Sequence, residues 1–184
     1  VSVIPHAPNT LTQYVQIEGF ANAEETSRNY CQRLLLTAIN RKENSQYAAT
    51  FRNKEVKFIF YASQFRPNKN IFTLLRAFEY LLRNRYLGHK LILTGRPQNM
   101  PEIGKFVIDN RLEHDVIFLH GLSVPELAAC YKLADVVVNP TLSEGGCPFT
   151  FTEALSVGTP VVMSRIQVAQ EILADPRMQE ITFF

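Results

Sequence analysis

From residue 56 onward, the chain alternates strand-sized apolar runs with segments of helical periodicity, the pattern of a parallel α/β sheet. The first run, at residues 56–62, is apolar enough to be covered on both faces. Further strands are predicted at residues 90–94, 116–119, 135–139 and 159–163. We therefore expect a Rossmann-like parallel sheet flanked by helices. Right-handed crossovers would place every strand-to-helix loop on one edge of that sheet, where such folds bind ligands.

The helices predicted between these strands carry apolar stripes and start signals. Residues 70–85 place apolar side chains at helical spacing, at Ile71, Leu74, Leu75, Phe78, Leu81 and Leu82. Ser123, with Glu126 three residues later, is a capping-box signature for the next helix. A last helix around Ile172 and a sixth strand at residues 181–184 would leave the sheet nearly, but not fully, built.

The first part of the chain differs, and we treat residues 1–55 as a lead-in to a domain at residues 56–184. Residues 8–19 are predicted to form a polar loop, and residues 42–53 another polar stretch. Between them, residues 24–40 are predicted to form a helix. Its inward-facing side chains would be Tyr30, Leu34, Leu35, Ala38 and Ile39.

Composition and charge exclude several classes of protein. The longest apolar runs are too short to span a bilayer, and no signal-peptide pattern is visible. The three cysteines and four histidines are too dispersed for a disulfide framework or a metal site, and reduced thiols are typical of the cytoplasm. Residues 51–111 hold 12 Lys and Arg against 4 Asp and Glu, or 12 − 4 = +8, which suits an anionic ligand or a solvated face. Because these cations are scattered, nucleic acid is disfavoured as a partner.

Two cations lie in the loop after the first strand. Arg66 and Lys69 flank the start of the following helix, where unpaired backbone N–H groups already favour an anion. One is fork-shaped and the other a point charge, a combination suited to a pyrophosphate. Taken singly, either could also be a solvated surface residue.

The loop after the fourth strand suits a close approach by the same ligand. Gly145 and Gly146 let the backbone come near a ligand and adopt positive φ. Pro148 suits the first helical position, which would leave the amides of Phe149 and Thr150 free to donate.

Two carboxylates and two further glycines complete the set of candidates. Glu144 and Glu153 cannot bind phosphate, but they accept hydrogen bonds from ribose or hexose hydroxyls. Alternatively, Glu153 is a partner of the helix dipole and Glu144 a surface charge. Gly95 and Gly121, which follow the second and third strands, could wall a base pocket. No glycine fingerprint of dinucleotide binding is present.

Taken together, these motifs resemble the C-terminal domain of glycosyltransferase family 4, the retaining nucleotide-sugar enzymes of GT-B fold. The resemblance covers roughly residues 56–173, and spacing, glycines and charges agree in three stretches. These are FYASQFRPNKNIFTLLRAF, VIFLHGLSVPELAACYKLADVVVNPTLSEGG and TEALSVGTPVVMS. Residues 3–6 look like the connection into this domain from a partner domain. The implied fold is the C-terminal half of a GT-B enzyme.

The resemblance implies roles for four residues. Lys69 matches the lysine that contacts the donor diphosphate. The family arginine before it is missing, because Ser63 and Gln64 stand where Gly-Arg is usual, and Arg66 could supply that charge. Glu153 matches the glutamate expected on the ribose, and Glu144 the one expected near the hydroxyls of the transferred sugar. The two glutamates are nine positions apart instead of the family's eight, so the extra residue lies in the 145–152 loop.

The function that follows is donor binding in a retaining, metal-independent glycosyltransferase with no cofactor. The enzyme would transfer a sugar from a nucleoside-diphosphate sugar to an acceptor glycan or lipid-linked sugar, in polysaccharide or glycolipid biosynthesis. The acceptor would bind an N-terminal domain absent from this chain, so the chain alone would be inactive. We expect a cytoplasmic protein. Contact with a membrane surface stays open, although the helix at residues 24–40 carries only Arg28 and Arg33 as basic residues.

Two alternatives remain from other classes. One is a non-catalytic nucleotide-sugar-binding module that partners another transferase, suggested by the missing Gly-Arg and the longer glutamate spacing. The other is a sugar-nucleotide epimerase of GT-B fold.

Overall fold

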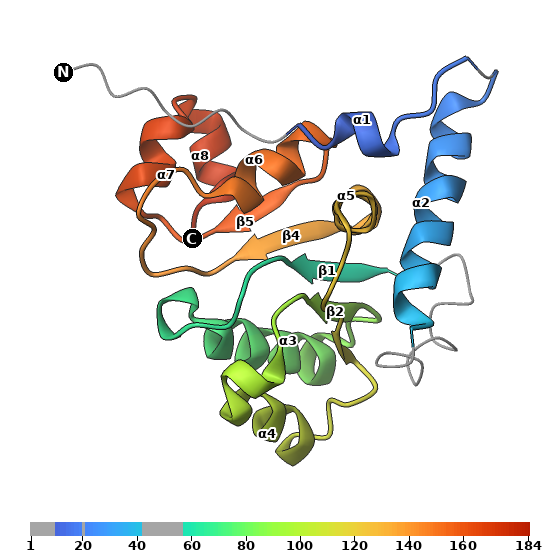
Figure 1. Cartoon of the computed structure of the whole chain (residues 1–184). Coiled ribbons are helices and arrows are strands. Elements are labelled where there is room, and N and C mark those ends of the chain that lie inside the picture. Colours follow the sequence, from blue (N-terminus) through green and yellow to red (C-terminus); the bar gives the residue numbers. More distant parts are fainter. Residues whose placement is uncertain (1–9, 20, 42–56) are drawn as a thin grey trace.

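The computed structural model of the chain describes residues 10–19, 21–41 and 57–184 (Figure 1). The connection predicted at residues 3–6, the polar stretch at 42–53 and the start of the first strand at Val56 lie outside the described residues. The division into residues 1–55 and 56–184 stays a prediction.

Five parallel strands form one sheet in the order β3-β2-β1-β4-β5. They are β1 (Phe58–Tyr61), β2 (Lys90–Leu93), β3 (Val116–Phe118), β4 (Val136–Asn139) and β5 (Val161–Met163). The Rossmann-like sheet predicted from the sequence is confirmed. The chain moves from β1 to β2 and β3 on one side, and then crosses to β4 and β5 on the other. The strand order therefore reverses beside β1, and ligands bind at such reversals in open α/β sheets.

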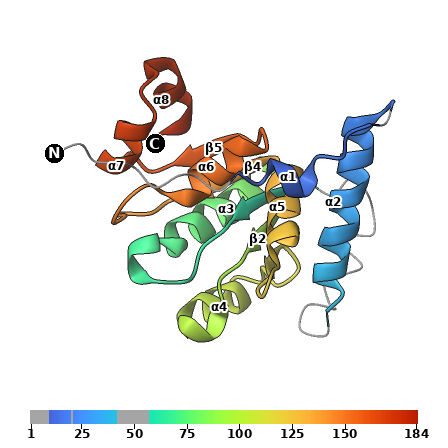
Figure 2. The same cartoon turned by 45° about the horizontal axis from the view of Figure 1, so that its top comes forward.

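Helices cover both faces of this sheet, and side chains that alternate along each strand make two separate cores (Figures 1 and 2). Ile59 and Tyr61 of β1 pack toward α3 (Ile71–Arg85) and α4 (Pro101–Asp109). Phe58 and Phe60 belong to the other core, which contains side chains of five other helices. These helices are α1 (Thr12–Val15), α2 (Ala23–Ile39), α5 (Val124–Leu133), α6 (Phe149–Ser156) and α7 (Gln167–Ile172), and α8 (Pro176–Thr182) follows them.

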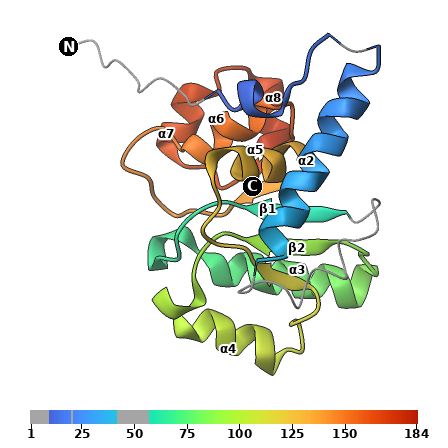
Figure 3. The ribbon, with the colours of Figure 1, turned by 45° about the vertical axis from the view of Figure 1, so that its right-hand side comes forward.

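The helices predicted at residues 70–85 and 24–40 are confirmed as α3 and α2, with one change in orientation. In α2 the buried stripe is Ser27, Cys31, Leu35, Ala38 and Ile39, whereas Tyr30 and Leu34 are half-buried. The cause is packing against α5, beside which α2 lies (Figure 3). The contact favours the small side chains Ser27 and Cys31, since they let two helices approach closely.

Three elements differ from the sequence predictions. The polar loop expected at residues 8–19 contains α1, in which Val15 is buried together with the N-cap residue Leu11. Helix α4 was not predicted, because only Ile103 and Val107 on it are buried. The prediction of a sixth strand at residues 181–184 is wrong, since Phe183 forms only an isolated bridge to Met163.

The missing strand is explained by a helix start. The carboxylate of Asp175 accepts a hydrogen bond from the amide of Arg177, and Pro176 occupies the first helical position. Both features favour a helix, and α8 runs on through Thr182, which leaves only the last two residues to pair.

The capping box predicted at Ser123 and Glu126 is confirmed and extends to the lead-in segment. The amide and hydroxyl of Ser123 donate to the Glu126 carboxylate at 2.7 and 2.8 Å. Arg41 forms an ion pair with the same carboxylate and donates to the carbonyl of Gly121 at 2.7 Å. Burial opposes ionisation of Glu126, but the hydrogen bonds from Ser123 and Arg41 outweigh it and lower the pKa of Glu126.

Within the described residues, no helix combines the length and the apolar character needed to cross a membrane.

We predict that Glu126→Gln lowers the free energy of unfolding at pH 7 by about 1–3 kcal/mol, because hydrogen bonds to a buried charge are lost. Since the folded-state pKa is lowered, the stabilisation is present above the ordinary value of 4.5 and disappears as the pH falls through the folded-state pKa. Urea titrations at pH 7 and pH 4 measure this, and the exposed Glu180→Gln is the control. A difference in stability that does not narrow at low pH would contradict the assignment.

Candidate functional site

A cavity of about 520 Å³ opens at the carboxyl edge of the sheet, between the loops that follow β1 and β4. This is the position at which the strand order reverses. Its lining consists of Ala62, Ser63, Lys69, Asn139, Glu144, Gly145, Gly146, Cys147, Pro148, Phe149, Thr150 and Glu153. Seven of the ten residues predicted for a donor site therefore lie together. They are Lys69, Glu144, Gly145, Gly146, Phe149, Thr150 and Glu153.

Hydrogen bonds join the two loops on which these residues lie. The backbone carbonyl of Asn68 accepts from the amide of Leu142 at 2.8 Å, and the Asn68 side-chain amide donates to the carbonyl of Ser143 at 3.1 Å. Asn70, next to Lys69, adopts a left-handed conformation with φ of 54° and turns the chain into α3. The position of the loop after β4 is thus tied to that of the loop after β1.

Lys69 and Glu144 form an ion pair across these loops. The Lys69 Nζ lies 2.5 Å from the Glu144 Oε1, and the two side chains are only 14% and 17% exposed. Without a ligand, the carboxylate predicted to face sugar hydroxyls therefore neutralises the cation predicted to face a diphosphate. An anion that enters the cavity must compete with Glu144 for Lys69.

The start of α6 offers backbone donors to the same cavity. Pro148 was predicted at the first helical position, but it lies at the N-cap, one position before the first helical residue Phe149, with φ of −70° and ψ of 101°. The first hydrogen-bonded amide is that of Phe151, which donates to the Pro148 carbonyl. Within the described residues, the amides of Phe149 and Thr150 have no hydrogen-bond partner. The helix dipole and these two amides favour an anion at this end of the cavity.

Glu153 lies one turn further along α6 and is almost buried, at 9% exposure. Its Oε2 accepts a hydrogen bond of 2.9 Å from the hydroxyl of Tyr131 on α5. Burial, reinforced by the negative charge of Glu153, raises the pKa of Tyr131 well above its ordinary value. The tyrosine therefore stays protonated and continues to donate at neutral pH.

Three predicted residues do not line the cavity. Arg66 is exposed, and its Nη2 donates to the Oε1 of Gln64 at 3.1 Å. Gly95 packs against the ring of Phe65, where an added Cβ would lie 2.2 Å from a ring carbon. Gly121 has φ of +70°, and its carbonyl accepts a hydrogen bond from Arg41. The glycine is therefore explained by the backbone conformation of this turn.

The geometry agrees with what sequence comparison finds. A family model described as "Glycosyl transferases group 1" matches residues 42–178. The chain belongs to this family.

Relatives of this transferase domain include two enzymes with assigned names. The O-antigen chain mannosyltransferase RfbU of Salmonella typhimurium is 33% identical over 110 residues, which is 59% of this chain and 30% of RfbU. The D-inositol 3-phosphate glycosyltransferase of Pseudarthrobacter chlorophenolicus is 32% identical over 111 residues, which is 59% of this chain and 26% of that enzyme. The chain thus spans about a third or less of the length of these relatives.

Solved glycosyltransferase structures share the fold. The C-terminal domain of the group 1 family protein LpcC from Francisella tularensis superposes with a TM-score of 0.59 at 19% identity, covering 83% of this chain and 78% of that domain. Anabaena HepE, solved in complex with UDP-glucose, gives a TM-score of 0.55 at 19% identity, covering 77% of this chain and 38% of HepE. The fold is therefore that of a C-terminal domain in a GT-B transferase.

The sequence predictions for this group 1 domain missed five residues of the site, among them Tyr131 and Asn139. Asn139 ends β4 and is 3% exposed, and its side-chain amide donates to the Thr150 Oγ1 at 2.8 Å. A polar residue at the carboxyl end of an otherwise apolar strand was the available signal. Ala62, Ser63 and Cys147 also line the cavity. Tyr131 lies on a helix in the core, and nothing in the sequence distinguishes it from a packing residue.

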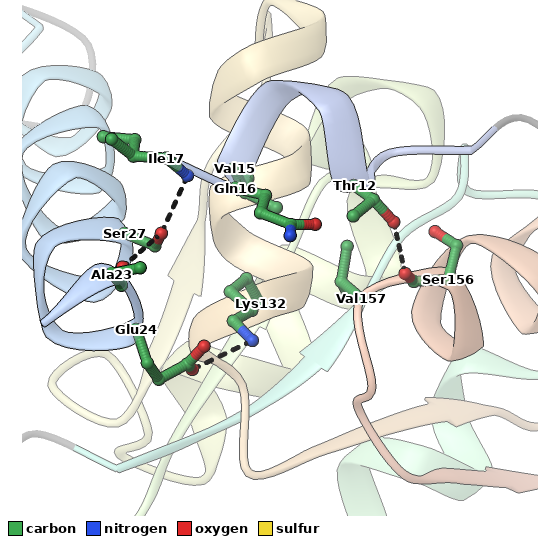
Figure 4. A pocket seen from close by; sticks show the side chains of 10 residues that line it. All are labelled: Thr12, Val15, Gln16, Ile17, Ala23, Glu24, Ser27, Lys132, Ser156 and Val157. Carbon is green, nitrogen blue, oxygen red and sulfur yellow. Dashed lines mark hydrogen bonds and ion pairs between the residues drawn. The ribbon is translucent and has the colours of Figure 1, made fainter. Parts of the chain in front are cut away.

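A second cavity of about 240 Å³ lies between α1, α2 and the ends of α5 and α6 (Figure 4). Its polar groups already satisfy one another. Thr12 donates to the Ser156 carbonyl, the Ile17 amide donates to Ser27, and Lys132 lies 3.0 Å from Glu24. Among the described residues, no group of three or more His, Cys, Asp and Glu could hold a metal ion at either cavity.

We predict that Glu144→Gln increases the affinity of the first cavity for inorganic pyrophosphate about fivefold to tenfold. The substitution frees Lys69 and removes a negative charge 2.5 Å from it, an effect of about 1 kcal/mol in a partly exposed site. Isothermal titration calorimetry at low ionic strength measures the change, and Glu113→Gln on the exposed surface is the control. Equal or weaker binding by Glu144→Gln would show that Lys69 does not receive the anion.

Proposed function

We propose that this chain is the donor-binding domain of a retaining, metal-independent glycosyltransferase of family 4, which transfers a sugar from a nucleoside-diphosphate sugar to an acceptor hydroxyl. One observation carries the proposal. A single cavity places a lysine, two unpaired helix amides and a buried carboxylate at the reversal point of a parallel sheet. Cation and amides suit a pyrophosphate, whereas the carboxylate suits a hydroxylated ring.

In the proposed complex, the pyrophosphate lies between Lys69 and the amides of Phe149 and Thr150. Negative charge grows on the departing nucleoside diphosphate as the glycosidic bond breaks, and these donors stabilise it. Gly145 and Gly146 leave room for the backbone to approach, since nothing lies within 4 Å of the position of an added Cβ at either residue. The positive charge comes from the protein, and no cofactor is part of the proposal.

Donor binding then rearranges the ion pair. When the phosphates engage Lys69, the Glu144 carboxylate is released and can accept hydrogen bonds from the hydroxyls of the transferred sugar. Arg66 joins the phosphates only after its side chain leaves Gln64. Gly95 and Gly121, on the loops after β2 and β3, are the proposed limits of the base pocket.

Glu153 binds the ribose in this proposal and does not attack the sugar. Its position deep in the cavity, with one oxygen bonded to Tyr131, suits a fixed acceptor. The two-carboxylate mechanism of glycosidases, in which one carboxylate is a nucleophile, is therefore not invoked.

For the complete protein we propose an acceptor glycan or lipid-linked sugar, bound by an N-terminal domain outside this chain. The names of the relatives RfbU and a lipopolysaccharide 1,2-N-acetylglucosaminetransferase of Salmonella typhimurium point to polysaccharide or glycolipid biosynthesis. A cytoplasmic enzyme at a membrane surface fits such acceptors. In the absence of the acceptor domain, the chain would bind donor without transferring its sugar.

A non-catalytic nucleotide-sugar-binding module is the second candidate. The ion pair between Lys69 and Glu144 and the pairing of Arg66 with Gln64 favour it, because both reduce the positive charge offered to a leaving group. A transfer assay of the complete protein with a panel of nucleoside-diphosphate sugars distinguishes the two candidates.

We predict that Lys69→Ala weakens the binding of UDP or GDP by an order of magnitude or more and lowers turnover in the complete enzyme. The loss follows from one charge-assisted contact of about 1.5–3 kcal/mol. Calorimetry and steady-state kinetics measure the two effects. Lys105→Ala, an exposed lysine on α4 away from the cavity, is the matched control. Unchanged affinity and turnover in Lys69→Ala would refute the phosphate assignment.

A further inference from the structure

The carboxylate of Glu153 is held by one hydrogen bond inside the protein and is otherwise directed at the cavity. Its Oε2 accepts from the Tyr131 hydroxyl at 2.9 Å. Among the described residues, the Oε1 has no hydrogen-bond donor and the carboxylate has no cation within ion-pair distance. Glu153 is nevertheless one of the residues that line the cavity. One oxygen is therefore committed to the protein and the other is left for a ligand.

Tyr131 is itself held in place by two contacts and by burial. Its ring packs edge-on against the ring of Phe60, with centroids 5.0 Å apart and an interplanar angle of 90°. Its backbone carbonyl accepts a 2.6 Å hydrogen bond from the Thr159 hydroxyl, which follows the end of α6. The side chain is fully buried. The hydroxyl therefore has a fixed position, and it fixes the carboxylate that it contacts.

A buried carboxylate needs such a partner. Without a donor, an ionised carboxylate in this environment is strongly destabilised and would turn toward solvent. An arginine or a lysine would neutralise the charge of the carboxylate. A single uncharged donor keeps the carboxylate in place and leaves its charge intact. The remaining oxygen then stays a strong acceptor for hydroxyl groups.

We propose that Tyr131 is a positioning residue of the donor site, which orients the Glu153 carboxylate so that its free oxygen accepts hydrogen bonds from the ribose hydroxyls of the nucleotide. Tyr131 does not touch the nucleotide and acts only through Glu153. The inference rests on the proposed function, because it assumes that the cavity takes a nucleoside diphosphate.

The test compares ligands that differ only in the ribose hydroxyls. Calorimetry with the full-length protein measures the affinities of UDP and GDP and of their 2′,3′-dideoxy forms. The ribose form of the preferred nucleotide is expected to bind about tenfold or more tightly than its dideoxy form, the effect of one hydrogen bond to a charged group. In Tyr131→Phe this ratio is expected to fall to about twofold, with the affinity for the dideoxy form unchanged.

Two further variants separate positioning from packing. Glu153→Ala and the double variant Tyr131→Phe/Glu153→Ala are expected to show the same affinities, because Tyr131 has no effect once the carboxylate that it orients is removed. Tyr61→Phe, at a tyrosine that is buried to the same degree but does not bond to Glu153, is the matched control and is expected to keep the wild-type ratio. Thermal unfolding confirms that each variant is folded.

Several outcomes overturn the proposal. It is wrong if Tyr131→Phe keeps the ribose preference, or weakens both nucleotide forms equally. Should Tyr131→Phe fail to fold, a loss of affinity in the double variant beyond that of Glu153→Ala overturns it as well. If the wild type binds no nucleoside diphosphate at all, the proposed function fails. If the wild type binds nucleoside diphosphates without a ribose preference, only the positioning role of Tyr131 fails.

Discussion

Strand β1 forms parallel hydrogen bonds with β2 on one side and with β4 on the other, and its four side chains are all buried. This double pairing places the carboxyl ends of β1 and β4 side by side, although the paired residues Ile59 and Val136 are 77 positions apart in sequence. The loops after these two strands consequently meet. Every group proposed to contact the diphosphate, the ribose or the transferred sugar is on one of them or on the helix that follows β4, so these contacts depend on this pairing.

The cavity contains charges of both signs, and the positive groups and the buried acceptor lie in different parts of it. Lys69 and the amides at the start of α6 provide positive potential at one end, whereas Glu153 provides an acceptor in the interior. Glu144 forms an ion pair with Lys69 and balances the charge of the lysine. Such an arrangement can accommodate a ligand that is anionic in its middle and hydroxylated on both sides, which is the shape of a nucleoside-diphosphate sugar.

Much of the fold was predictable because parallel strands buried on both faces leave continuous apolar runs, and all five strands were located within one or two residues. The sixth strand was predicted wrongly, because the cap at Asp175 and Pro176 starts a helix through the same residues. Local patterns also located the glycines and carboxylates of the site. They could not show that Lys69 pairs with Glu144, or that Tyr131 reaches Glu153, since both contacts join residues distant in sequence. Arg66 looked like a phosphate ligand by position alone, and a side chain's direction is not encoded in spacing.

The hydrogen bonds from Leu142 and to Ser143 attach the β4 loop to Asn68. The segment of this loop up to Ser143 is therefore fixed by the loop that follows β1. At the other end, the hydrogen bond between Asn139 and Thr150 anchors the start of α6. Between these two anchors lies a short open segment, in which the two glycines have free space around them, so this segment has room for insertions or deletions. In the proposed complex this open segment lies beside the transferred sugar, so a change in its length would alter the sugar pocket and leave the proposed phosphate and ribose contacts in place.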